Sequence, residues 1–265
     1  MGKIIAIVNQ KGGVGKTTTA VNLAAALGSL KKKVLLIDID PQGNSTSGMG
    51  VSKKDVKNSS YELIIGSVDV FLTIMNLPFK NVDLIPSNMN LAGAEIELTS
   101  VEHRENCLKK ALISIKNDAD WIKYDYILLD CPPSLSLITI NALCAADSVL
   151  VPMQCEYFAL EGLSQLMNTL KQVKSAYNPY LEIEGLLLTM FDKRLNLTQQ
   201  IVTELKKYFP NKVFSSFIPR SVRLAEAPSF GEPIIYFDKS SKAAKAYMNV
   251  AEELIKKNKR KAKDI

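Results

Sequence analysis

A glycine-rich segment near the N-terminus carries the clearest chemistry in this sequence of 265 residues. Residues 9–19 read Asn-Gln-Lys-Gly-Gly-Val-Gly-Lys-Thr-Thr-Thr, between an apolar β-branched run and an alanine-rich stretch with helical periodicity. Glycines let backbone N–H groups turn toward phosphate oxygens, and the start of a helix adds partial positive charge. Lys16 is suited to contact the β- and γ-phosphates of a nucleotide, and the Thr17 hydroxyl to ligate Mg²⁺. The predicted phosphate-binding residues are Lys11, Gly12, Gly13, Val14, Gly15, Lys16, Thr17 and Thr18.

The loop departs at one position from the common spacing Gly-x-x-x-x-Gly-Lys-Thr. Gln10 stands where that spacing has its first glycine, and Lys11 follows it. Lys11 therefore brings a second cation close to a bound triphosphate. Taken alone, Lys11 is more typical of a solvated lysine in a surface loop.

Three aspartates stand where parallel strands are expected to end. Asp130 closes the apolar run at 126–129, the place of a carboxylate that holds Mg²⁺ directly or through water. Asp38 and Asp40 end the run that starts at residue 34, and Asp40 precedes Pro-Gln-Gly-Asn, a turn able to act as a nucleotide-sensitive switch. An aspartate at a strand end can also simply cap a turn. We predict a magnesium ligand at Asp130.

Short apolar runs alternate with longer stretches that have helical periodicity. We predict strands at 4–8, 34–39, 82–85, 126–129, 148–151, 186–190 and 213–218, and helices at 17–30, 91–116, 135–145, 160–176 and 197–209. This alternation indicates a mostly parallel, doubly wound sheet flanked by helices, an α/β fold that binds ligands at the carboxyl ends of its strands. Residues 52–80 read as helical turns plus loop. No linker or internal repeat divides the chain, so we predict a single domain at 1–255 followed by a basic tail at 256–265.

The net charge of +6 is concentrated at the C-terminus. Residues 256–265 hold six basic residues and one acidic residue and carry +5, whereas the preceding residues carry only +1. Such a tail is most simply a solvated chain end, and contact with DNA or anionic lipid is the alternative. Four cysteines without a Cys-x-x-Cys pair disfavour a zinc site and indicate reduced thiols. The N-terminal apolar run is too short for a signal peptide or membrane span, so we expect a cytoplasmic protein.

The phosphate loop resembles the deviant Walker A motif of the ParA/MinD ATPases. The resemblance continues through residues 38–44, 130–134, 154–157 and 219–224, and it covers nearly the whole chain except 52–80 and the tail. Within these ATPases the sequence is most similar to the chromosome-partitioning subgroup called ParA or Soj. The resemblance implies a phosphate-loop NTPase fold and hydrolysis of ATP with Mg²⁺. It also implies an ATP-dependent homodimer that binds DNA nonspecifically on the nucleoid and is reset by a ParB-type centromere-binding protein.

The resemblance implies roles for individual residues as well. Lys11 would reach across a nucleotide-sandwich dimer to the phosphates bound by the other copy, Asp40 would orient or activate the attacking water, and Asp38 would support the Mg²⁺ shell. Pro219 and Ser221 would lie near the adenine. The expected catalytic residues are therefore Lys11, Lys16 and Asp40, the expected metal-binding residues are Thr17, Asp38 and Asp130, and the expected DNA-binding residues are Arg194 and Arg223.

Two other functions remain compatible with the sequence. Residues 244–255 place apolar side chains in a stripe before the basic tail, as a MinD-like membrane-associated ATPase would, although a terminal helix packed on the core gives the same pattern. An ATP-dependent amidotransferase or synthetase can also use this fold, because phosphate loops do not specify the second substrate. A glutamine-using enzyme needs a cysteine with a partner histidine, and His103 lies in a charged stretch that suggests no such pair. Cys131 alone gives weak support to an iron protein with a bridging cluster.

Overall fold

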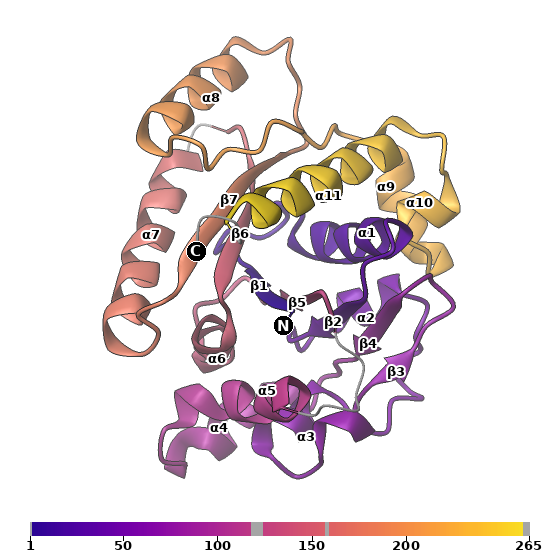
Figure 1. Cartoon of the computed structure of the whole chain (residues 1–265), viewed down its shortest axis with the longest axis vertical. Coiled ribbons are helices and arrows are strands. Elements are labelled where there is room, and N and C mark those ends of the chain that lie inside the picture. The colour runs from indigo at the N-terminus through magenta and orange to yellow at the C-terminus, as the bar shows by residue number, and fades with distance from the viewer. Residues whose placement is uncertain (1, 118–123, 157–158, 262–265) are drawn as a thin grey trace.

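The computed structural model describes residues 2–117, 124–156 and 159–261, and Figure 1 shows the whole chain. Its β-strands are β1 (Lys3–Ile7), β2 (Val34–Asp38), β3 (Met75–Asn76), β4 (Val82–Ile85), β5 (Tyr126–Asp130), β6 (Ser148–Gln154) and β7 (Glu182–Thr189). Its α-helices are α1 (Lys16–Ser29), α2 (Asn44–Gly48), α3 (Ser60–Ile65), α4 (Leu91–Glu97), α5 (Cys107–Asn117), α6 (Leu137–Ala145), α7 (Ala159–Ala176), α8 (Asn196–Tyr208), α9 (Val222–Glu226), α10 (Ile234–Phe237) and α11 (Lys242–Lys261). Four 3₁₀ turns are η1 (Val70–Leu72), η2 (Leu98–Ser100), η3 (Arg104–Asn106) and η4 (Ala227–Phe230).

The seven strands form one sheet in the order β3-β4-β2-β5-β1-β6-β7. All neighbouring strands are parallel except β3, which pairs antiparallel with β4. β1 therefore lies inside the sheet, with β5, β2, β4 and β3 on one side of it and β6 and β7 on the other. The loop after β1 opens at the carboxyl end of the sheet, beside β5 and β6. The predicted α/β class with a mostly parallel sheet is confirmed.

Alternation along the buried strands assigns their side chains to two apolar layers. In β1, Ile4 and Ala6 join the layer formed with α3 to α8, whereas Ile5 and Ile7 join the layer formed with α1, α10 and α11. Figure 1 shows α1 and α11 side by side on one face of the sheet and α3, α4 and α5 on the other. Both faces are thus covered, which explains why the strands are apolar throughout.

The predicted strand at 213–218 is wrong, because these residues form no strand and only an isolated bridge joins Val213 to Leu186. Its ends bond to β7, since Phe214 N–H donates to the Leu186 carbonyl and Ile218 N–H to the Leu188 carbonyl, each over 2.9 Å. Between them, the N–H groups of Ser215 and Ser216 donate to the carboxylate of Glu253 on α11. A helix side chain has therefore taken the place of the strand partner.

The predicted single helix at 91–116 is also wrong, because it is divided into α4, η2, η3 and α5. His103 adopts a left-handed backbone with φ of 55° at the break. Asn141 of α6 stabilises the break, since its Oδ1 accepts from Leu108 N–H over 3.1 Å and its Nδ2 donates to the Arg104 carbonyl over 2.9 Å. The stretch 52–80 holds helical turns, as predicted, and in addition the short strand β3.

The C-terminal helix α11 packs on the sheet instead of projecting from it. Ala244, Tyr247, Val250, Ala251 and Leu254 of its apolar stripe are buried. The helix continues through Lys261 into the predicted tail, and residues 262–265 lie outside the described residues. In the described part of the chain, no helix has the length and apolar character needed to cross a membrane.

Candidate nucleotide-binding site

The loop between β1 and α1 has the backbone geometry of a phosphate cradle. Gly13 and Gly15 adopt left-handed conformations, with φ of 72° and 87°, that would strain any residue with a side chain. Helix α1 begins directly after Gly15, and no described side chain caps its first N–H groups. These N–H groups and the partial positive charge of the helix start are therefore available to an anion.

Lys16 lies inside the site, with only 7% of its surface exposed. Its Nζ donates to the backbone carbonyl of Lys11 over 3.2 Å. Burial lowers the pKa of the Lys16 ammonium, and the negative charges of Asp130 and Asp40 oppose that shift. The structure thus brings the predicted phosphate-binding lysine together with two of the predicted aspartates.

Asp38 and Asp130 occupy paired positions on the neighbouring strands β2 and β5, and both are fully buried. Burial raises the pKa of Asp38 to about 6. Burial, reinforced by the charge of Asp38, raises the pKa of Asp130 to about 8. Two carboxyl groups in one dry site disfavour the doubly ionised state unless a cation is present. The pair is therefore electrostatically suited to a divalent ion.

The two carboxylates differ in the contacts that they already make. Asp38 Oδ2 accepts from the N–H and the hydroxyl of Thr46, over 2.8 and 2.7 Å, and its Oδ1 accepts from Asp40 N–H over 3.2 Å. Asp130 Oδ2 accepts from the Ser45 hydroxyl over 2.7 Å, whereas its buried Oδ1 has no hydrogen-bond partner among the described residues. This orphaned oxygen fits a magnesium ligand. The Thr17 hydroxyl lies close enough to the same carboxyl group to lower its pKa. Asp38 instead holds the segment that follows β2.

The described residues contain no group of three or more His, Cys, Asp and Glu side chains arranged to hold a metal by themselves. Magnesium in nucleotide sites is commonly held by one or two protein oxygens, with phosphate and water completing its shell. The Asp130 and Thr17 pair is therefore sufficient for Mg²⁺ bound together with a nucleotide.

Asp40 lies in a tight turn at the edge of the same pocket. Its Oδ1 accepts from Gln42 N–H over 2.9 Å, and its backbone carbonyl accepts from Gly43 N–H over 2.8 Å. Lys53 donates from outside to the backbone carbonyl of Gln42. The predicted switch turn is thus well defined, and it carries a nearly buried carboxyl group to the phosphate side of the site.

A cavity of about 230 Å³ adjoins the phosphate loop. It is lined by Gly15, Thr18, Thr189, Met190, Ile218, Pro219, Arg220, Ser221, Leu224, Ala225 and Tyr247. Pro219 and Ser221 therefore lie beside the loop, where the resemblance places the base. The cavity is largely apolar, as a site for the flat ring of a purine should be.

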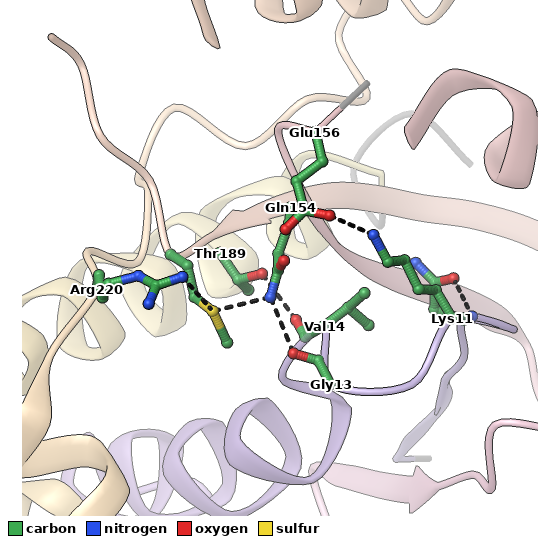
Figure 2. A network of polar contacts seen from close by, with 9 residues as sticks. Lys11, Gly13, Val14, Gln154, Glu156, Thr189 and Arg220 are labelled. Atoms are coloured by element: carbon green, nitrogen blue, oxygen red, sulfur yellow. Dashed lines mark hydrogen bonds and ion pairs between the residues drawn. The ribbon is translucent and has the colours of Figure 1, made fainter. Parts of the chain in front are cut away.

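Figure 2 shows that the ends of β6 and β7 hold the phosphate loop from outside. Gln154 Nε2 donates to the Gly13 carbonyl over 2.9 Å, and the Thr189 hydroxyl donates to the Val14 carbonyl over 2.7 Å. The Lys11 ammonium forms an ion pair with Glu156. The two contacts to backbone carbonyls, from Gln154 and Thr189, fix the loop before any ligand arrives.

Sequence reasoning missed several of these residues as parts of the site. Gln154 and Glu156 belong to the segment that carries the family resemblance, which ends at Tyr157, outside the described residues, but the sequence alone gives them no role. Thr189 and Met190 end the predicted strand at 186–190, and that position at the carboxyl end of a strand was the available signal. Tyr247 offered none, because its place in a helical apolar stripe predicts only a core residue.

Arg194 and Arg223 lie outside the pocket and are exposed. The Arg194 guanidinium donates hydrogen bonds from Nε and Nη2 to both oxygens of the Asp192 carboxylate and lowers the pKa of that group to about 2. Arg223 pairs with Glu226 over 2.8 Å and with Asp238 over 3.2 Å. Both predicted DNA-binding arginines are therefore engaged with acidic residues of their own chain.

A mostly parallel sheet with a glycine-rich loop, a buried lysine and paired carboxylates at its carboxyl edge defines a phosphate-loop nucleotide-binding protein. Comparisons with known proteins specify the family. A profile described as the AAA domain matches residues 2–183. Sporulation initiation inhibitor protein Soj of Bacillus subtilis (strain 168) is 56% identical over 254 residues, which are 96% of this chain and 98% of that protein. Chromosome partitioning protein ParA of Myxococcus xanthus is 48% identical over 258 residues, 97% of this chain and 89% of that protein.

Among solved structures, cobyrinic acid a,c-diamide synthase from Mycobacterium smegmatis with bound ADP and magnesium superposes with a TM-score of 0.84. It is 34% identical, and the match covers 98% of this chain and 96% of that one. The same protein with an ATP analogue and magnesium gives a TM-score of 0.83. The chain belongs to the Soj/ParA family of chromosome-partitioning ATPases, as its motifs predict.

Proposed function

We propose that this chain binds ATP together with Mg²⁺, pairs with a second copy while ATP is bound, binds DNA nonspecifically as that dimer, and is reset by hydrolysis. The observation that carries the proposal is the contrast between two lysines of one loop. Lys16 is buried beside the aspartates, whereas the side chain of Lys11 is 46% exposed. One cation would serve the nucleotide of its own chain, and the other, exposed at the rim and paired with Glu156, would turn to a second molecule.

The described contacts support in-line attack of water on the γ-phosphate. Lys16 and the N–H groups at the start of α1 would hold the phosphates and stabilise charge on the equatorial oxygens. Asp40 would accept a hydrogen bond from the attacking water and so orient it. Thr17 and the free oxygen of Asp130 would hold Mg²⁺, which supplies charge neutralisation between the β- and γ-phosphates. Asp38 would keep the switch segment in register through Thr46.

Because part of the stabilising charge would come from Lys11 of the other copy, turnover should require the dimer. The isolated chain should hydrolyse ATP slowly. A ParB-type centromere-binding protein is the partner that we propose to accelerate it, on the strength of the family. Cytoplasmic location on the nucleoid follows from the proposed binding to DNA.

Arg194 and Arg223 are the proposed contacts to DNA phosphates, and each would exchange an acidic partner for a phosphate. Further positive charge lies next to Arg194 in the sequence, because Lys193 lines a groove along α11 together with Lys242 and Lys245. Among the described residues, its lining includes no acidic side chain. Contacts of this kind carry little sequence information. Two arginines per chain give about four phosphate contacts in a dimer and a log–log salt slope near −3.6.

Neither rival function gains support from the described side chains. The apolar stripe of α11 that suggested a membrane contact is buried against the core. The four cysteines are free thiols, and His103 lies with Glu102 and Glu105 on the surface, so no cysteine and histidine pair exists among the described residues. The synthase whose structure is similar shares 34% identity with this chain, against 56% for Soj.

Size-exclusion chromatography of the wild type and of Asp40→Ala, with ATP and with or without DNA, tests the proposal. Asp40→Ala should accumulate as a DNA-retaining dimer, because binding is preserved while hydrolysis is blocked. Lys16→Ala serves as the control that cannot load nucleotide. An Asp40→Ala protein that stays monomeric at saturating ATP would refute the proposal.

A further inference from the structure

The Lys11 ammonium already has a carboxylate partner in the single chain. Glu156, just beyond the end of β6, forms an ion pair with it (Figure 2). This pair is the only side-chain hydrogen bond or ion pair that either residue makes within the described part of the chain. Both side chains are about half exposed, at 46% and 49%, so the pair lies at the rim of the site within reach of a second molecule.

The contacts around this pair indicate that Glu156 is not needed to hold the loop itself. The backbone of the loop is fixed by Gln154 at Gly13 and by Thr189 at Val14, and Lys11 N–H donates to Asn9 Oδ1 over 3.0 Å. Among the described residues, the Glu156 carboxylate bonds to the Nζ at the end of the Lys11 side chain and to no atom of the loop backbone. Its effect should therefore fall on the position of that ammonium and not on the shape of the loop.

We propose that Glu156 is a positioning residue that holds Lys11 within its own chain until a second, ATP-loaded copy arrives. This inference rests on the proposed role of Lys11 in the dimer. Carboxylate and phosphate are both strong acceptors for an ammonium group, so they compete for it. Pairing of two copies then exchanges a Lys11 contact with Glu156 for a Lys11 contact with the partner's phosphate. The exchange happens twice in a symmetric dimer, which raises the ATP and protein concentrations needed for pairing.

Lys16 also has an acceptor within its own chain, since its Nζ donates to the Lys11 carbonyl over 3.2 Å. Both lysines thus have acceptors supplied by the protein, and Lys11 takes part in both contacts. When the Lys16 ammonium binds a nucleotide phosphate, it no longer donates to the Lys11 carbonyl. The Lys11 ammonium remains paired with Glu156. Loading and pairing are therefore separate exchanges, and Glu156 acts only on the second.

Glu156→Gln removes the competing charge and keeps the shape of the side chain. An exposed ion pair shifts an equilibrium by about 1.4- to 5-fold, and two pairs break per dimer, so the dimer dissociation constant should fall by about 2- to 30-fold. We would measure it by sedimentation equilibrium of the full chain with a non-hydrolysable ATP analogue and Mg²⁺. The gain should shrink at high salt, because screening weakens the pair in the wild type. Analogue affinity at monomeric concentration and the melting temperature should stay unchanged.

Glu161→Gln is the matched control, since Glu161 is exposed in the first turn of α7 and makes no side-chain hydrogen bond or ion pair with described residues. It should leave the dimer constant unchanged. If Glu156→Gln pairs no better than the wild type while Lys11→Ala fails to pair, the positioning role falls and the proposed dimer stands. If Lys11→Ala pairs as well as the wild type, the proposed function and this inference fall together.

Discussion

Charged groups in the interior of the nucleotide site are buried, whereas those at its rim are exposed and paired with groups of opposite charge. In the interior, Lys16, Asp38 and Asp130 are buried, and burial shifts the pKa of each away from its ordinary value. Lys11 at the rim and Arg194 outside the pocket are exposed and paired with carboxylates of their own chain. The interior is thus prepared for ligands before they arrive, at a cost to the folded state. The rim holds weak pairs that a phosphate can replace.

This difference in burial suits the two sets of groups to different ligands. Buried groups cannot move to a new partner without a ligand that satisfies them, so they define what the single chain binds. Exposed ion pairs exchange partners at little cost, because solvent screens both the old and the new contact. The rim therefore suits reversible contact with a second copy or with DNA, whereas the interior suits tight binding of one nucleotide.

Removal of the interior cation, Lys16, is expected to have the largest effect. Lys16→Ala should reduce nucleotide affinity by more than about 100-fold, because a buried charged hydrogen-bond donor to phosphate is lost in a dry site. Lys11→Ala removes the same charge from the rim of the same loop and should change the affinity of the single chain by less than about 5-fold. Isothermal titration of both variants with ATP and Mg²⁺, at concentrations below pairing, measures the contrast. Equal losses of nucleotide affinity in the two variants would show that the difference in burial between Lys16 and Lys11 does not separate their roles.

A second effect concerns the stability cost of the buried carboxylates. The folded pKa of Asp130 is about 8, against an ordinary value of 3.8, so the folded chain binds more protons than the unfolded chain between these values. The stability of the magnesium-free protein should therefore fall as pH rises through that range. Asp130→Asn removes the charge and should raise the melting temperature at pH 8 by about 4–8 °C, as about 2 kcal/mol does in a chain of this size.

The pH dependence supplies the control for this effect. Near pH 4 the wild-type carboxyl is protonated as well, so the two melting temperatures should converge there. Magnesium-dependent nucleotide binding should be lost at every pH, since the free oxygen of Asp130 is the proposed ligand. An Asp130→Asn protein that melts below the wild type at pH 8 would mean that Ser45 and its surroundings need the charge.

The interior was more predictable from sequence than the rim. The phosphate loop and Asp130 follow apolar runs directly, so local spacing and strand direction were enough to place them together. Glu156 at the rim and Tyr247 in the cavity beside the phosphate loop depend on contacts between distant segments, which no periodic pattern in the sequence predicts. The same limit explains the strand that failed. The run at 213–218 looks like a strand because of its apolar residues, but the carboxylate of Glu253 from α11 takes two of its N–H groups.

The smallest expected effect comes from Lys53, an exposed lysine that contacts the turn carrying Asp40. Lys53 donates to the Gln42 carbonyl in the turn that carries Asp40, whereas its neighbour Lys54 makes no side-chain hydrogen bond or ion pair with described residues. Lys53→Ala should lower the ATP turnover number by about 2- to 5-fold, because it removes one exposed charged hydrogen bond from the turn and leaves the two bonds made by Asp40. The dimer constant should not change, since Lys53 acts on the turn alone. Lys54→Ala removes the same charge from the adjacent position and should keep wild-type turnover, so a similar loss in both variants would assign the effect to net charge and not to the turn.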